Sequence, residues 1–186
     1  MRDWIIGTCA LLAADAAQAQ VGAEQSVKVG SWEIAAEPAQ KLCKMYRYYG
    51  STVDDHIEGL VVRYDATTEA VSLTWSTDGS VPFPGDGQIG LHLSFFNGKS
   101  IDDSWGSRTF RHGKPDDTRY FVNGFDGPKN AQRILRDLAR NELIGLYLGP
   151  VLMTALSLDA SNATEALRKC SASIVGRKPP DPPLAG

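Results

Sequence analysis

The sequence predicts an α+β domain: a mostly antiparallel β-sheet, sandwich- or barrel-like, with two helices of the C-terminal half packed on it and one disulfide. Two observations lead to this fold class. Apolar and polar side chains alternate in short segments over the first two thirds of the chain, as they do in half-buried strands. After residue 127 the apolar residues recur at the spacing of an α-helix.

The N-terminus is predicted to be a secretory signal peptide covering residues 1–19. Its apolar run, residues 4–14, is shorter than the roughly 20 residues that span a bilayer. The tripeptide Ala17-Gln18-Ala19 has the small-x-small pattern of a signal-peptidase site. We therefore expect a periplasmic or secreted protein with no transmembrane segment after cleavage.

The mature chain is predicted to hold one domain between two loose ends. Its 167 residues (186 − 19) suit a single hydrophobic core. The expected parts are a loose leader at 20–26, one α+β domain at 27–175 and a proline-rich disordered tail at 176–186.

Strands are expected first along this domain. They are predicted at residues 27–35, 42–49, 60–64, 71–75, 89–95 and 119–122. The cleanest alternation, at 89–95, is followed by Asn97-Gly98, a pair that favours a tight hairpin turn. The polar link 65–69 is expected to join two strands in another hairpin.

Helices and further strands are expected in the last third. Helical spacing runs from Pro128 to about Asn141, with the proline suited to the first turn. Segments 143–148 and 151–158 are apolar enough for buried strands. A second helix should begin near Asn162, which has capping-box spacing to Glu165.

Cys43 and Cys170 are the two cysteines that remain once the signal peptide, with Cys9, is removed. In an oxidising compartment the simplest arrangement is a disulfide between them. Cys170 falls on the apolar side of the second predicted helix, where Cys43 from an early strand could reach it. Two separate buried thiols are the alternative.

Residues near both ends of the predicted domain resemble a known family. An early Gly-x-Trp-x-Ile strand is followed by a cysteine, and a late sheet segment is followed by a helix with a final cysteine. These residues are Gly30, Trp32, Ile34 and Cys43, then Ser157-Leu158, Glu165-Ala166-Leu167 and Cys170. The pattern is similar to that of small exported proteobacterial proteins of the invasion-associated locus B family. The resemblance implies a periplasmic or secreted, non-catalytic protein and supplies no catalytic residues.

The charge of the mature chain is small. Removing Arg2, Asp3 and Asp15 with the signal peptide changes the formal net charge from −3 to −2. A chain this close to neutrality has no overall attraction to nucleic acid, and no nucleic-acid partner is expected.

No cofactor or metal site is predicted. Segment 85–90 matches G-x-G-x-x-G, but an alternating strand follows it, whereas a dinucleotide site needs a helix there. We interpret these residues as loop glycines. His56, His92 and His112 are not paired at metal-ligand spacing.

A periplasmic hydrolase is the competing function. His92 or His56 would act with nearby Asp and Ser residues, because a catalytic triad needs no local sequence motif. The chain has no G-x-S-x-G or H-E-x-x-H motif. His92 is instead expected to be half exposed on the polar face of its strand.

A row of cations on the first predicted helix is the most specific surface feature. Its members fall within a stripe of roughly 60°, opposite the apolar side and with no acidic residue inside it. The members are Lys129, Arg133, Arg136 and Arg140. The leading hypothesis is therefore a non-enzymatic binding or accessory protein of the bacterial envelope that docks an anionic partner, either an envelope protein or a surface component. An ordinary solvated helix face is the alternative.

Cleavage before Gln20 is the first testable prediction. The protein recovered from its native envelope should begin at Gln20, because Ala17 and Ala19 mark the processing site. Intact-mass spectrometry measures this. Native material that retains residues 1–19 would contradict the prediction.

Overall fold

The computed structural model describes residues 26–50, 57–77, 86–98, 100–114 and 118–176. The predicted signal peptide, almost all of the leader and residues 177–186 of the tail lie outside these ranges. His56 and the first glycine of the 85–90 motif lie outside them as well.

The described residues form one antiparallel sheet of 11 strands. The strand order is β1-β2-β3-β4-β5-β9-β8-β6-β10-β11, and β7 pairs with β6 beside this path. The strands are β1 (Ser26–Val29), β2 (Trp32–Glu37), β3 (Leu42–Gly50), β4 (Ile57–Asp65), β5 (Ala70–Thr77), β6 (Gly87–Phe96), β7 (Ile101–Asp102), β8 (Ser107–Gly113), β9 (Arg119–Phe125), β10 (Leu143–Leu148) and β11 (Val151–Ser157).

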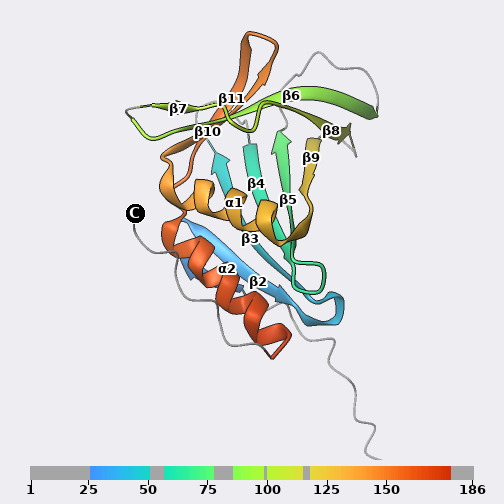
Figure 1. The fold of residues 1–186 in the computed structure, drawn as a ribbon, viewed down its shortest axis with the longest axis vertical. Coiled ribbons are helices and arrows are strands. Elements are labelled where there is room, and N and C mark those ends of the chain that lie inside the picture. Colours follow the sequence, from blue (N-terminus) through green and yellow to red (C-terminus); the bar gives the residue numbers. More distant parts are fainter. Residues whose placement is uncertain (1–25, 51–56, 78–85, 99, 115–117, 177–186) are drawn as a thin grey trace, which may run out of the picture.

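The sheet is strongly curved but open. Strand β6 runs across the ends of β3, β4 and β5, and the β10–β11 hairpin projects beyond it (Figure 1). The outermost strands of the order, β1 and β11, do not pair with each other, so the sheet is not a closed barrel. The predicted α+β class with an antiparallel sheet is confirmed, and the barrel-like form is replaced by an open, curved sheet.

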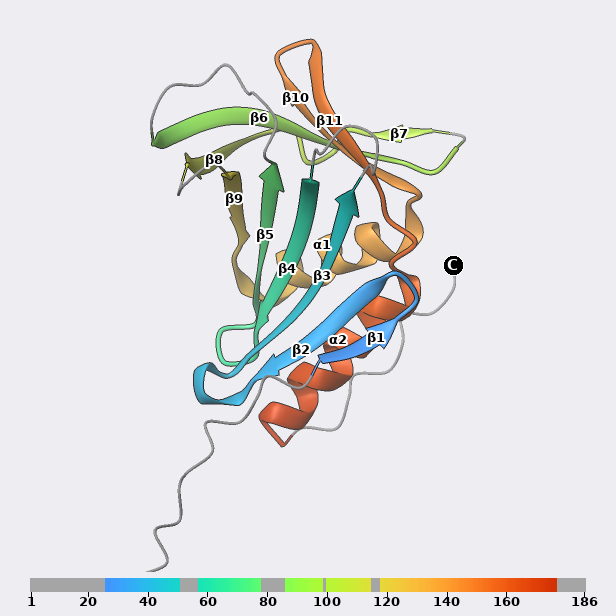
Figure 2. The ribbon, with the colours of Figure 1, turned by 180° about the vertical axis from the view of Figure 1, so that it is seen from behind.

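Two helices cover one face of the sheet. Helix α1 (Gly127–Arg140) packs against β5 and β9, and α2 (Ser161–Ile174) packs against β2 and β3. Seen from behind, β2 to β5 present their other face with no helix over it (Figure 2). A one-turn 3₁₀ helix, Pro38–Gln40, joins β2 to β3.

Aromatic side chains fill the space between the sheet and the helices. The largest fully buried residues include Trp32, Trp75, Phe95, Phe110 and Phe125, which come from five different strands. Each large aromatic side chain that is fully buried stabilises the fold by about 1.5–3 kcal/mol relative to leaving it exposed. This core therefore holds the curvature of the sheet.

Local turn chemistry follows the sequence prediction at two hairpins. The Asp65 carboxylate accepts the backbone N–H groups of Thr67 (2.7 Å) and Thr68 (3.1 Å) between β4 and β5. Gly98 has a φ of +76° in the turn after β6, and the Asn97 N–H donates to the Ser100 carbonyl.

The structure differs from the sequence prediction in three places. The strand predicted at 27–35 is a hairpin of β1 and β2, because Gly30 has a φ of +61° and turns the chain. Strand β8 was not predicted. The capping box at Asn162 is wrong: α2 begins at Ser161, and its N-cap residue, Ala160, makes no side-chain capping bond.

The C-terminal half is fastened to the first strands by side chains that bind backbone carbonyls. The Trp32 indole N–H donates to the Leu158 carbonyl over 2.8 Å, inside the core. The Tyr49 hydroxyl donates to the Ser157 carbonyl at 2.7 Å, and Arg47 donates to the carbonyls of both residues. We call these five residues the carbonyl clasp.

The predicted disulfide between Cys43 and Cys170 is confirmed. It joins β3 to α2 with 6.1 Å between the two Cα atoms. Cys43 is fully buried and Cys170 packs against the edge of the same core. The bridge therefore holds α2 over the strands that it covers.

Replacing both cysteines with alanine should lower the free energy of unfolding by about 3–4 kcal/mol, because the bridge constrains a long loop of the unfolded chain. Urea denaturation of the mature double variant and the wild type measures the difference. As a control, wild type denatured without reductant should expose no free thiol. Two titratable thiols there would contradict the disulfide.

Candidate binding sites

The four cations of the predicted basic row all lie on α1. Lys129, Arg136 and Arg140 are exposed, and Arg133 is half buried. Arg140 stands in the last turn, where a positive charge interacts favourably with the helix dipole. The structure thus places the row on one helix face but divides it into members with different surroundings.

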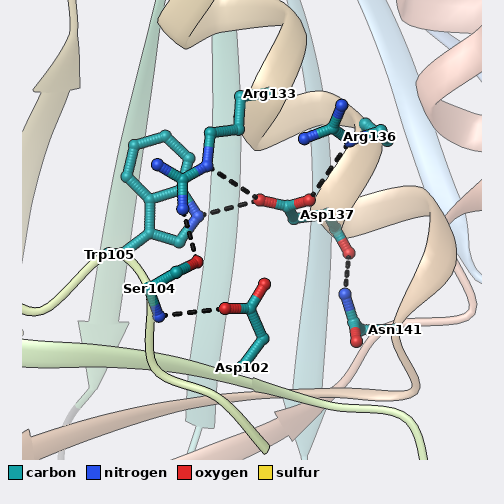
Figure 3. A network of polar contacts seen from close by, with 7 residues as sticks. All are labelled: Asp102, Ser104, Trp105, Arg133, Arg136, Asp137 and Asn141. Carbon is teal, nitrogen blue, oxygen red and sulfur yellow. Dashed lines mark hydrogen bonds and ion pairs between the residues drawn. The ribbon is translucent and has the colours of Figure 1, made fainter.

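Asp137 is the centre of a polar network beside this row (Figure 3). The residue is buried, and its carboxylate accepts the indole N–H of Trp105 at 2.9 Å. The Nε atoms of Arg133 and Arg136 lie 3.8 Å and 3.5 Å from its two oxygens. A buried carboxylate needs such partners, because leaving it unpaired would cost several kcal/mol.

Arg133 also fixes the loop between β7 and β8. Its guanidinium carbon lies 4.0 Å from the centre of the Trp105 ring, and the group donates to the Ser104 hydroxyl. On β8, the guanidinium carbon of Arg108 lies 4.5 Å from the ring centre of Phe125, which belongs to the neighbouring strand β9. Burial, followed by the positive charge of Arg133, lowers the pKa of Arg108. The arginines and aromatic rings therefore form a packed layer between loop and helix.

Asp102 completes this layer at the start of the loop. Its carboxylate accepts the backbone N–H of Ser104 at 2.9 Å. Hydrogen bonds from Ser104 lower the pKa of Asp102, and the charges of Arg133 and Arg136 add to the effect. The carboxylate is thereby held in its charged form beside the two arginines.

These contacts differ from the expectation that every cation of the row projects away from the core, because Arg133 is half buried. Asp137 lies about 40° around the helix from Arg133, just outside the predicted stripe, so its carboxylate reaches both arginines. The sequence contained Asp137, but only the approach of Trp105 from 32 positions earlier shows why it is buried. Arg133 is a structural residue of the network.

The residues of the hydrolase hypothesis meet only in part. The His92 Nε2 atom lies 3.4 Å from Asp103 Oδ1, and the Ser94 hydroxyl donates to the same oxygen. The carboxylate thus stands between histidine and serine, whereas a triad needs the histidine in the middle. Ser94 is also buried. His92 is half exposed, as the alternation predicted.

An exposed apolar face was missed by sequence reasoning. Four of the six large hydrophobic residues that are exposed in the described part of the chain lie on β7, β10 and β11. Their exposed fractions range from 38 % to 62 %. They are Ile101, Leu143, Val151 and Leu152.

The strand register gathers most of these side chains on the outer side of the sheet. Phe96 pairs with Ile101 on one side and with Leu143 on the other, so the three share one face. Gly145 lies between two aromatic rings of this face: a Cβ atom there would lie 3.2 Å from the rings of Phe96 and Tyr147. We call this surface, together with the tip of the β10–β11 hairpin, the apolar face.

No family model, curated protein or solved structure matches the chain. In the described ranges, no three His, Cys, Asp or Glu side chains converge as a metal site would require. None of the helices described is long and apolar enough to cross a membrane.

Replacing Asp137 with alanine should lower the free energy of unfolding by about 2–3 kcal/mol, because Trp105 and two arginines lose a buried partner. Chemical denaturation monitored by tryptophan fluorescence measures the loss. Lys129→Ala, on the exposed side of the same helix, is the control and should change stability by no more than about 0.5 kcal/mol. Equal stability of the two variants would show that the network contributes nothing.

Proposed function

We propose that this chain is an exported, non-enzymatic accessory protein of the bacterial envelope that works by binding another protein through its apolar face. The disulfide supports an oxidising compartment, where such bonds form and persist. The leading function is thus the binding role expected from the sequence, carried by a different surface.

The observation that carries the proposal is the β10–β11 hairpin. Residues 143–157 contain no charged side chain, in a chain that is 22 % charged. Yet the tip of the hairpin projects from the body of the protein. Val151 and Leu152, the first residues of β11, are exposed there. Gathered exposed apolar side chains cost solubility and are typical of interaction surfaces.

A protein fits this face better than a bilayer does. Membrane-surface segments usually flank their apolar side chains with Lys or Arg, which contact anionic headgroups. The residues that flank this hairpin are acidic, Glu142 before it and Asp159 after it. Their charges would be repelled by an anionic membrane surface.

The hydrolase alternative is less well supported. A nucleophilic serine must be reachable by substrate and must give its proton to the histidine. Ser94 is buried and donates to Asp103 instead. We interpret His92, Asp103 and Ser94 as a polar network that fixes the loop after β7.

Docking of an anionic partner stays a prediction for the exposed cations of α1. Lys129, Arg136 and Arg140 remain at the surface, which favours this hypothesis. Asp102 and Asp137 lie beside the row and reduce its net charge. The apolar face is therefore the stronger candidate.

Replacing Val151 and Leu152 with serine should abolish capture of the envelope partner while leaving stability nearly unchanged, because both side chains are exposed. Cross-linking in the native envelope, followed by mass spectrometry, measures capture. Val27→Ser is the matched control, since Val27 is 63 % exposed and Val151 62 %. A double variant that keeps the wild-type set of partners would exclude this face.

Binding of a second copy of the chain must be distinguished from binding of a different protein. Light scattering of the purified mature protein gives its oligomeric state. A dimer that the serine variant dissolves would mean that the apolar face binds a second copy of the chain.

A further inference from the structure

A groove of about 480 Å³ lies over strands β2, β3 and β4. Neither α1 nor α2 covers this face of the three strands (Figure 2). It is formed by side chains of β2, β3 and β4 that point away from the core. The lining residues are Glu33, Lys44, Tyr46, Tyr48, Val61 and Arg63. Its volume is within the range of small-molecule binding sites, about 300–1,000 Å³.

The floor of the groove is aromatic. Tyr48 is 64 % exposed, an unusual position for so large a ring. It pairs with Gly59 of the neighbouring strand β4, where an added Cβ atom would lie 3.1 Å from the Tyr48 ring. The absence of a side chain at Gly59 therefore lets the ring lie close to the backbone, with much of its surface in solvent.

Tyr46 extends this floor and holds its position through polar contacts. Its ring centre lies 5.9 Å from that of Tyr48, in an edge arrangement with 63° between the planes. Its hydroxyl donates to Glu33 at 2.6 Å, and that bond is the largest cause of the raised pKa of Tyr46. The neighbouring Lys44 ammonium lies 5.8 Å from the Tyr46 ring centre.

The charges around the floor are balanced. Lys44 forms an ion pair with Glu37 at 2.9 Å, and Glu33 is engaged with Tyr46. Two cations, Lys44 and Arg63, thus stand beside two anions, Glu33 and Glu37. The site offers many hydrogen-bond donors and acceptors but no excess of either charge, so it provides little attraction for an ionic ligand.

We propose that this groove binds an uncharged saccharide. The C–H faces of a sugar ring carry weak positive charge and stack on the negative face of an aromatic ring, here Tyr48. Sugar hydroxyls both donate and accept hydrogen bonds, which suits the mixture of Glu33, Lys44 and Arg63. An apolar ligand would cover the polar groups of Glu33, Lys44 and Arg63 without bonding to them, and an anion would gain little from a site whose charges are balanced.

The site is separate from the proposed docking surface. The groove is built on β2 to β4, whereas the apolar face is built on β6, β7, β10 and β11. Neither proposal depends on the other, and a result for one leaves the other unchanged.

The test is a titration of the mature protein with neutral oligosaccharides, chitotetraose, maltotetraose and cellotetraose, followed by calorimetry and backbone amide NMR. At least one should bind and shift the amides of β3 and β4 around Tyr48. Added salt should barely change its affinity, because the ligand carries no charge. No binding by any of the three at millimolar concentration would overturn the proposal.

Variants locate the site. Tyr48→Ala should weaken binding at least tenfold, and Tyr48→Phe should keep most of the affinity because the ring remains. Tyr147→Ala, on the apolar face, is the matched control and should bind as the wild type does. Equal binding by Tyr48→Ala would overturn the proposal, as would an affinity that falls steeply with salt, which would indicate an anionic ligand.

Discussion

The carbonyl clasp is the constraint on which the rest of the structure depends. Strand β11 ends the strand order, far from β2 and β3, yet Trp32, Arg47 and Tyr49 hold the backbone just beyond it. The sheet must curve for these contacts to form, and the chain then continues into α2 over β2 and β3. Burial raises the pKa of Tyr49 to about 12, so its hydroxyl keeps the donated proton at neutral pH.

Much of the fold could be predicted because apolar periodicity records which side of an element is buried. The strands β3 to β6 and both helices were found in this way, and the disulfide followed from the cysteine count. Strand β8 was missed because it buries Phe110 as its only large apolar side chain, among arginine, threonine and histidine. The hairpin at Gly30 was missed although its signal is in the sequence: the apolar positions change phase there, from Val27 and Val29 to Trp32 and Ile34.

The candidate sites were harder to predict because exposure depends on which elements come to lie on a surface. Segments 143–148 and 151–158 were expected to be buried strands, but Leu143, Val151 and Leu152 are exposed. Tyr46 and Tyr48 share one face of β3, but no local sequence signal indicates that this face is left without a helix. The pairing of Arg133 with Asp137 likewise depends on Trp105, which arrives from a distant loop.

The long reach of the clasp also sets an order on biosynthesis. Leu158, which accepts the hydrogen bond of Trp32, is synthesised 126 residues later. Cys170 follows Cys43 by 127 residues. Contacts so distant in sequence close slowly, because a long flexible loop must be ordered first. The first strands therefore leave the ribosome without the groups that complete them. The clasp and the disulfide can therefore close only after the last helix has been made.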